Sequence, residues 1–439
     1  MERRTFLKGV AQSAVAAATL SPALEASRVL AAPVAMSQTT VTFWQFDTGT
    51  PALASWRTAI ADFEAHNRDV KINMVIVPWQ EQAQKLTTAL STGTPPDVSM
   101  MGNDVVAEYA NIGALAPLDS YFQAWSKQVG HDITQDFYPG DHLYYRYKGH
   151  WYASPISEET RLVYYRKSML KSAGIDPAKA FQTYQSMRQA ALALTKPAKK
   201  IFGWGMPGGI NYFTLQTFMT FYLAWGARYL NAKGLCGFDT PEFRAALTFY
   251  TNLYRKDHVT PPDTPIYDEV KLSSLFQAGK LAMMIDGPWL WTGITDKALL
   301  NDIGLAQLPR GPKGRFAFLG GWPLVLWARS GNKDATFRFI QYITDPTKAM
   351  TTVCLGNGVL PGRKSLADKA PWNRMPNSIF VSQLNLAYPY QYPYPEIPQM
   401  GSLEVDAVQT PVQNVMLGRA SVNKATTDLV HHINSVLHP

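Results

Sequence analysis

The chain has very little cysteine, because only Cys236 and Cys354 occur among its 439 residues. A single disulfide bond between them is possible in an oxidising compartment, but a framework of several disulfides is excluded. Neither a C-x-x-C nor an H-E-x-x-H motif is present, and the eight histidines are scattered along the sequence. We therefore expect no metal site and no cofactor.

Runs of basic residues are also missing. The formal net charge is +8, yet no Lys/Arg-rich run of the kind that binds nucleic acid occurs. Hydrophobic residues make up 46% of the chain and charged residues only 17%, so a sizeable core can form. The length suggests two domains or two lobes of one fold. We expect a monomer without a nucleic-acid partner.

Signatures of catalysis are absent or out of context. No G-x-S-x-G nucleophile elbow occurs. Residues 203–208 fit G-x-G-x-x-G literally, but no acidic residue follows about 20 positions on, as a dinucleotide site requires. A glycosidase needs two carboxylates about 5–10 Å apart. Glu158 and Glu159 are neighbours, which point to opposite faces of a strand, and Asp286 would need a tertiary contact with one of them. We expect a non-enzymatic binder, with an exported glycosidase or redox enzyme as the less favoured alternative.

The N-terminus has the composition of an export signal. The run R-R-T-F-L-K at residues 3–8 precedes an Ala-rich apolar stretch, Val10–Leu20, and then small residues up to Ala35. This apolar stretch is far shorter than the ~20 residues that span a membrane. The pattern predicts a signal peptide over residues 1–35, and the paired arginines resemble a twin-arginine signal. Cleavage after Ala31, Ala32 or Ala35 fits equally well. We expect export into a Gram-negative periplasm.

Strand and helix patterns alternate after the signal. Thr40–Phe46 and Val70–Val77 have strand patterns, while Ala52–His66 and Glu81–Leu90 have helical ones. A Pro-Pro-Asp-Val turn at 95–98 then enters a short buried strand. This order predicts an α/β fold with a parallel-rich sheet. Ligands bind such sheets at the carboxyl ends of the strands, which places the loops after Phe46 and Met101 at the ligand.

One segment, F-Q-A-G-K-L-A-M-M-I-D-G-P-W-L-W at Phe276–Trp291, is the most informative. A short apolar strand, Leu281–Ile285, leads into a turn at Asp286-Gly287-Pro288. Trp289 and Trp291 follow at once. A rigid aromatic side chain at such a corner is either a platform for a flat ligand face or part of the core.

This segment resembles the F-x-x-G-x-x-A-M-x-x-x-G-x-W run of the periplasmic sugar-binding proteins of ABC importers. Other landmarks occur in the same order as in that family: Phe43-Trp44, P-P-D-V at 95–98, G-A-L-A-P-L at 113–118, W-Y-A-S-P at 151–155, L-V-Y-Y at 162–165, K-S-A-G-I at 171–175, L-G-G-W at 319–322 and I-P-Q-M at 397–400. The resemblance implies the periplasmic-binding-protein fold (type II-like), in which two α/β lobes joined by crossing segments close on a ligand as a hinge. The closed form would dock on the transmembrane subunits of an ABC permease.

The resemblance also suggests where the lobes divide. Lobe 1 would comprise residues 36–155 and about 304–385, and lobe 2 residues 156–303 and about 386–439, unless the C-terminal helices pack across both lobes. The expected crossings are Pro155–Tyr165, Ile303–Pro309 and the Tyr/Pro-rich stretch near Tyr388–Pro395.

Sugar recognition combines aromatic faces with groups that hydrogen-bond hydroxyls. The resemblance implies that Trp289 matches the Trp on which the family stacks its sugars. It also implies that Tyr212 matches a ring-bearing position of the maltodextrin binders and that Glu159 matches a carboxylate that binds sugar hydroxyls. Asp104, together with Asn103, resembles another such position.

Three further candidates rest on their place in the sequence. Asp47 follows the first strand, Trp322 follows two glycines that would let a ligand approach the backbone, and Arg363 follows Gly362. The alternative for the polar candidates is a solvated loop, and for Trp322 it is core packing.

Two departures from the maltodextrin binders bear on the ligand. Met101 stands where they carry a Trp, and Leu403-Glu404-Val405 stands where they carry aromatics. Fewer stacking faces argue against a long maltodextrin. A monosaccharide, a disaccharide, a sugar alcohol and glycerol phosphate or another small anion remain open.

Overall fold

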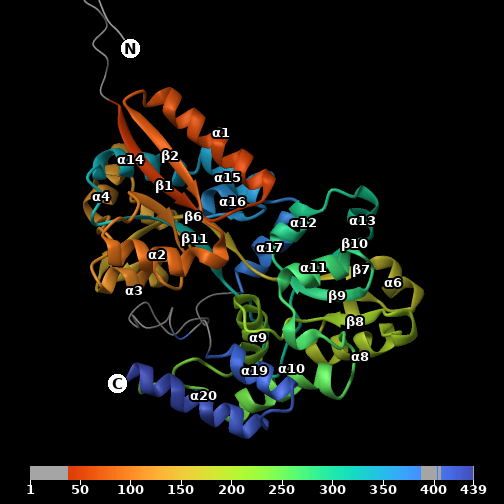
Figure 1. Ribbon diagram of the computed structural model, residues 1–439. Coiled ribbons are helices and arrows are strands. Elements are labelled where there is room, and N and C mark those ends of the chain that lie inside the picture. The colour runs from red at the N-terminus through yellow and green to blue at the C-terminus, as the bar shows by residue number, and fades with distance from the viewer. Residues whose placement is uncertain (1–37, 387–402, 404–406, 439) are drawn as a thin grey trace, which may run out of the picture. The chain divides into compact units, whose positions relative to one another are not determined.

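Two mixed β-sheets with helices packed around them form the part of the chain that the computed structural model describes, namely residues 38–386, 403 and 407–438, without the side chain of Gln80 (Figure 1). The predicted α/β fold class is thus confirmed. The expected export signal, the I-P-Q-M landmark, the third crossing near Tyr388–Pro395 and residues 404–405 lie outside the described residues.

The larger sheet has six strands in the order β12-β6-β11-β3-β1-β2. Their bounds are β1 Thr39–Gln45, β2 Val70–Ile76, β3 Val98–Met100, β6 Ala153–Glu159, β11 Gly320–Leu326 and β12 Leu360–Pro361. Strand β1 runs parallel to β2 and β3, whereas β11 is antiparallel to both β3 and β6. The three parallel strands therefore end at one edge of the sheet, where the loop after β1 carries Asp47.

The smaller sheet has four strands in the order β10-β7-β9-β8. Their bounds are β7 Leu162–Arg166, β8 Phe202–Gly205, β9 Leu281–Asp286 and β10 Ile303–Ala306. Strand β9 is parallel to β8 and antiparallel to β7, which also pairs with β10. All six residues of β9 are buried, as expected for a short apolar run covered on both faces. A separate pair joins β4 Arg146–Tyr147 to β5 His150–Trp151.

Helices and 3-10 turns (η) connect these strands. In chain order they are α1 Thr50–His66, η1 Trp79–Glu81, α2 Gln82–Thr92, α3 Val106–Asn111, α4 Asp119–Val129, η2 Ile133–Asp136, α5 Asp141–Tyr144, α6 Lys167–Ser172, α7 Pro177–Ala180, α8 Tyr184–Leu194, η3 Pro197–Lys199, α9 Tyr212–Trp225, α10 Pro241–Arg255, η4 Thr264–Ile266, α11 Glu269–Gln277, α12 Pro288–Gly293, α13 Lys297–Asp302, α14 Lys333–Thr344, α15 Lys348–Asn357, α16 Lys364–Ala367, α17 Asn377–Leu384, α19 Gln409–Met416 and α20 Val422–Leu437.

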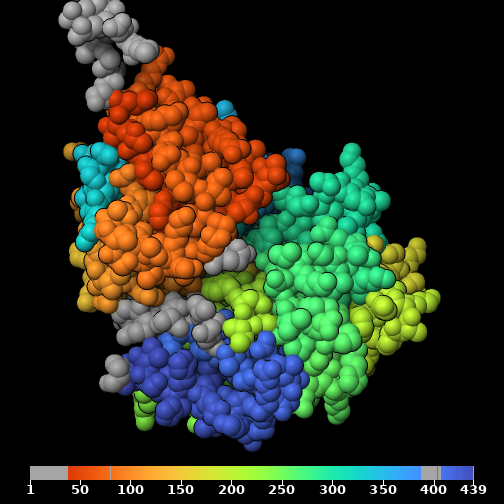
Figure 2. All heavy atoms as spheres, viewed as in Figure 1, coloured from red at the N-terminus to blue at the C-terminus, as the bar shows by residue number. Residues whose placement is uncertain are grey.

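Local sequence explains where the helices near the smaller sheet begin. Asn211, Thr240 and Asp268 precede α9, α10 and α11, and each side chain accepts a hydrogen bond from a backbone N–H of the first turn. Helix α9 is mostly apolar, and its residues from Phe213 to Ala224 are all buried. The C-terminal helices α19 and α20 pack against α10, as the blue and green residues of Figures 1 and 2 show.

The chain passes directly from one sheet to the other at Thr160-Arg161, which join β6 to β7. It returns after Ala306, between β10 and β11. Strand β6 stays in the six-stranded sheet up to Glu159, whereas we expected lobe 1 to end at residue 155. Residues 304–306 belong to the four-stranded sheet, whereas we expected lobe 1 to resume at about residue 304. The division into two domains that move separately stays a prediction.

Candidate functional site

Asp47 lies just beyond the end of β1 and is almost completely buried. Its Oδ1 accepts a hydrogen bond from Nε1 of Trp79, the first residue of η1, at 3.1 Å. The backbone N–H of Asp47 donates to Oε1 of Gln45 at 2.6 Å, which fixes the loop. Burial raises the pKa of Asp47 to about 6, although the indole N–H of Trp79 opposes this shift.

Three tryptophan rings form a row beside this carboxylate. Trp79 and Trp322 have ring centroids 5.6 Å apart, and Trp322 and Trp289 have centroids 6.1 Å apart with planes inclined by 26°. Trp322 lies on β11 of the six-stranded sheet, whereas Trp289 lies on α12 just after β9 of the four-stranded sheet. The predicted strand-to-helix corner at Asp286–Pro288 is present. The row therefore joins elements of the two sheets.

The two glycines before Trp322 have a different effect from the one we expected. A Cβ at Gly320 would collide with the carboxylate of Glu159, and a Cβ at Gly321 would lie 2.5 Å from the hydroxyl of Tyr145. The space that these glycines leave is thus filled by side chains of the protein. Because Gly320 and Gly321 have no side chains, β11 can pair closely with β6, where Gly320 is opposite Glu159.

A buried ion pair lies where the chain passes between the sheets. Glu159 ends β6, and its Oε2 accepts from the guanidinium of Arg161, which also donates to Oε1 of Gln216 on α9. The guanidinium carbon lies 4.6 Å from the ring centroid of Trp289 and 4.8 Å from that of Phe318. Burial raises the pKa of Glu159 to about 7, because desolvation outweighs the opposing charge of Arg161. The pair places the guanidinium of Arg161 against the tryptophan row.

Asp104 and Tyr212 form a second link between elements of the two sheets. The hydroxyl of Tyr212, at the start of α9, donates to Oδ2 of Asp104, which follows β3. The neighbouring Asn103 is buried and is fixed by its backbone N–H, which donates to the carbonyl of Gly321 at 3.1 Å. Asp104, Asn103 and Tyr212 thus lie near the strand that carries Trp322.

A carboxylate that sequence reasoning did not select, Glu269, accepts a hydrogen bond from Nε1 of Trp289. Asp286 is fully buried, and burial together with the charge of Glu269 raises the pKa of its carboxyl group well above the usual range. Sequence reasoning also missed Trp79 and Arg161. The available signal was modest: a Trp directly after the second strand, and an Arg between two strand patterns after paired glutamates.

The structure does not bring Arg363 to this cluster. Its guanidinium is buried and donates to the carbonyl oxygens of Thr344 at 2.9 Å and Ile133 at 3.0 Å. It also lies over the rings of Phe137 and Trp125, 4.3 and 5.0 Å from their centroids. Burial lowers the pKa of Arg363 to about 10. These contacts give it a packing role around α14 and η2.

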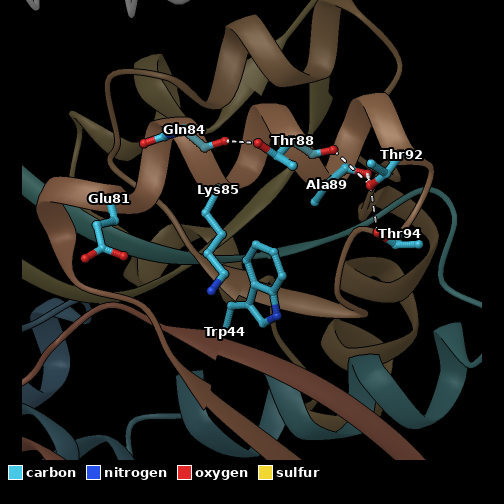
Figure 3. A pocket seen from close by; sticks show the side chains of 8 residues that line it. All are labelled: Trp44, Glu81, Gln84, Lys85, Thr88, Ala89, Thr92 and Thr94. Carbon is cyan, nitrogen blue, oxygen red and sulfur yellow. Dashed lines mark hydrogen bonds between the residues drawn. The ribbon is translucent and has the colours of Figure 1, made fainter.

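A surface hollow of about 460 Å³ lies elsewhere, over helix α2, and shares no residue with the cluster (Figure 3). Figure 3 shows the indole of Trp44 on its floor with the Lys85 side chain above it, their separation being 6.0 Å from Nζ to the ring centroid. The remaining lining residues come mostly from α2: Glu81, Gln84, Thr88, Ala89, Thr92 and Thr94. None of the candidate site residues lines this hollow, whereas Trp289 and Trp322 are part of the tryptophan row.

Within the described residues, no helix has the length and apolar character required to cross a membrane. The same residues contain no group of His, Cys, Asp and Glu side chains that could hold a metal ion. Cys236 and Cys354 are both buried free thiols, so they do not form the disulfide bond that the sequence left open.

The sequence profile described as "bacterial extracellular solute-binding protein" matches residues 47–350. The chain belongs to this family. Two curated solute-binding relatives are the maltotriose-binding protein of Pyrococcus abyssi and the mannitol-binding protein of Pseudomonas aeruginosa. The first is 25% identical over 80% of this chain and 72% of its own length. The second is 26% identical over 64% of each chain.

Solved structures of ABC-transporter solute-binding proteins have the same fold. The protein from Thermotoga lettingae with bound alpha-D-tagatose superposes with a TM-score of 0.81 and 27% identity, covering 91% of this chain and all of that one. The resemblance stated from the sequence is thereby confirmed, and this solute-binding protein has the periplasmic-binding-protein fold. The comparisons do not test the individual site residues, which therefore stay predictions.

Proposed function

We propose that this chain is the substrate-binding component of an ABC importer, and that it captures a sugar or a related polyol. The observation that carries the proposal is the row of Trp79, Trp322 and Trp289 with carboxylates beside it. Aromatic faces pack against the C–H-rich faces of sugars, while carboxylates accept hydrogen bonds from hydroxyl groups. Relatives that bind maltotriose, mannitol and tagatose support this ligand class.

The charges at the site favour a neutral ligand over an anionic one. Asp47, Asp104, Glu159 and Glu269 all have side chains in the cluster. The guanidinium of Arg161 is already paired with Glu159 and bonded to Gln216. An incoming phosphate or carboxylate would meet the carboxyl groups of Asp47, Asp104 and Glu269, while the charges of Glu159 and Arg161 offset one another. Glycerol phosphate, which the net charge of the whole chain left open, is therefore the less favoured ligand.

Capture works by closure of two lobes around the ligand. Trp289 and Tyr212, from elements of the four-stranded sheet, meet Trp322 and Asp104 from those of the six-stranded sheet. A ligand that touches both sides shifts the population toward the closed form by its higher affinity for that form. The closed protein then delivers the ligand to the transmembrane subunits of a permease. It acts in the periplasm as a monomer, after removal of residues 1–35, with neither a cofactor nor a catalytic step.

A thermal-unfolding screen tests this proposal. The chain is heated with neutral sugars and alditols, including D-mannitol, D-tagatose and maltotriose, and with matched sugar phosphates and sugar acids. A ligand at a hundred times its dissociation constant adds ~2.7 kcal/mol to the free energy of unfolding. We expect stabilisation by one class of neutral carbohydrate. Stabilisation by anionic compounds alone would contradict the proposed ligand class, and release of reducing sugar from a glycoside would contradict the absence of catalysis.

A further inference from the structure

The indole of Trp289 is held at its edge by a carboxylate. Nε1–H of Trp289 donates to Oε1 of Glu269. Glu269 is the first residue of α11, a helix capped by Asp268, whose side chain accepts from the backbone N–H of Lys271 at 2.9 Å. The carboxylate thus projects from the fixed first turn of a helix and not from a loop.

A second carboxyl group supports Glu269 from inside. Asp286, the last residue of β9, is fully buried, and the charge of Glu269 acts on its carboxyl group. Ser273 Oγ donates to its Oδ2 at 3.1 Å, and the backbone N–H of Gly287 donates to its Oδ1 at 2.7 Å. Burial, together with the charge of Glu269, raises the pKa of Asp286 well above its usual range. Glu269 is thus placed between the indole N–H of Trp289 and a buried carboxyl group that is itself fixed by two hydrogen bonds.

The turn before Trp289 leaves room for the ring. A Cβ at Gly287 would collide with the six-membered ring of the Trp289 indole, so the indole lies back over its own turn. Its ring also contacts the guanidinium of Arg161 and the ring of Trp322. Packing limits where the ring lies, and the bond to Glu269 adds a directional contact at its N–H edge.

We propose that Glu269 is a positioning residue that fixes the plane of the Trp289 indole and so sets the face that the ligand meets. The inference rests on the proposed function, because it takes Trp289 to be a ligand platform. Glu269 acts through the indole N–H and not by touching the ligand.

Nuclear magnetic resonance of the chain with 15N-labelled tryptophan tests the bond without any ligand. Trp289→Phe identifies the indole signal of Trp289. We expect Glu269→Ala to shift this signal and to make its N–H exchange with solvent roughly tenfold faster, as loss of one hydrogen bond predicts. Glu269→Gln, which keeps an acceptor oxygen, should retain most of the protection. Glu242→Ala is the matched control, because Glu242 lies in the first turn of another helix, α10. An unchanged Trp289 signal in Glu269→Ala would overturn the inference.

Titrations with D-mannitol, D-tagatose and maltotriose separate this inference from the proposed function. For any probe that the wild-type chain binds, we expect Glu269→Ala to lower affinity about fivefold to tenfold and to have no further effect in a Trp289→Phe background. An effect of the same size in both backgrounds would mean direct contact with the ligand and would overturn the positioning role. If Trp289→Ala leaves binding of the probe unchanged, the proposed ligand site is wrong. The nuclear magnetic resonance measurement still decides whether Glu269 holds the indole of Trp289.

Discussion

The ring centroids of Trp289 and Trp322 lie 6.1 Å apart with planes inclined by 26°, although Trp322 is on β11 of the six-stranded sheet and Trp289 is on α12, which follows β9 of the four-stranded sheet. Both side chains are only partly buried, unlike the tryptophans of the core. Two partly exposed indoles that meet across the passage between the sheets are suited to hold a flat ligand face. Four predictions test this site and the structure around it.

Replacing Trp289 should separate binding from stability. We expect Trp289→Ala to lower ligand affinity at least tenfold, because it removes an aromatic face, while the melting temperature of the ligand-free protein changes little. Trp204 on β8 is fully buried and serves as the comparison. Trp204→Ala should cost about 3–5 kcal/mol of unfolding free energy. Calorimetric titration and thermal unfolding measure the two effects. A Trp289→Ala protein as unstable as Trp204→Ala would identify Trp289 as a core residue.

Stability should fall as the pH rises from about 4.5 to 7. The pKa of Glu159 is raised by burial to about 7, from its ordinary value of 4.5. Within this window the folded protein retains a proton that the unfolded chain has released, so rising pH favours unfolding. Above pH 7 this contribution no longer changes. Below about pH 4.5 both states are protonated, and the contribution again is constant.

Glu159→Gln should flatten this dependence by at most about 3.5 kcal/mol across the window, since one pKa unit corresponds to about 1.4 kcal/mol. Urea unfolding between pH 4 and 8 measures the difference, with Glu242→Gln as the control. An identical pH dependence in wild type and Glu159→Gln would show that Glu159 does not keep a raised pKa in the folded protein.

Replacing Arg363 should have the opposite outcome to replacing Trp289. Arg363→Met removes two hydrogen bonds to buried carbonyls and the contacts with Phe137 and Trp125. We expect a loss of about 2–4 kcal/mol in unfolding free energy, with ligand affinity unchanged within about twofold. A large loss of affinity in a stable Arg363→Met protein would return Arg363 to the ligand site.

The two thiols should be unreactive in the folded protein. Cys236 and Cys354 are buried and free, and burial raises the pKa of Cys236 to about 11 and that of Cys354 further still. A water-soluble maleimide should therefore label neither thiol in native buffer and both in urea. Recovery of an unlabelled, oxidised pair under denaturing, non-reducing conditions would contradict the free-thiol structure.

Local patterns were sufficient for much of the fold. The strand expected at Thr40–Phe46 is observed at Thr39–Gln45, and the helix expected at Ala52–His66 runs from Thr50 to His66. Alternation and turn residues specify such elements within a few positions. The turn before Trp289 was also visible, because Gly and Pro occur together there.

The polar contacts of the site could not be read from the sequence. Glu269 bonds a residue twenty positions away, and Arg161 bonds Gln216 on another element. Such pairs depend on tertiary packing, which residue spacing does not specify. Arg363 shows the same limit: the sequence left a ligand contact or a solvated loop open, whereas aromatic rings and backbone carbonyls surround its guanidinium in the structure.

The most direct test is a crystal structure of the chain with the neutral carbohydrate that stabilises it most. We predict that the ligand packs against the indole of Trp289 or Trp322 and that its hydroxyl groups lie within hydrogen-bond distance of at least one of Asp47, Asp104 and Glu159. A ligand bound only in the hollow over α2, against Trp44 and Lys85, would contradict the proposed site while leaving the fold and the family unchanged.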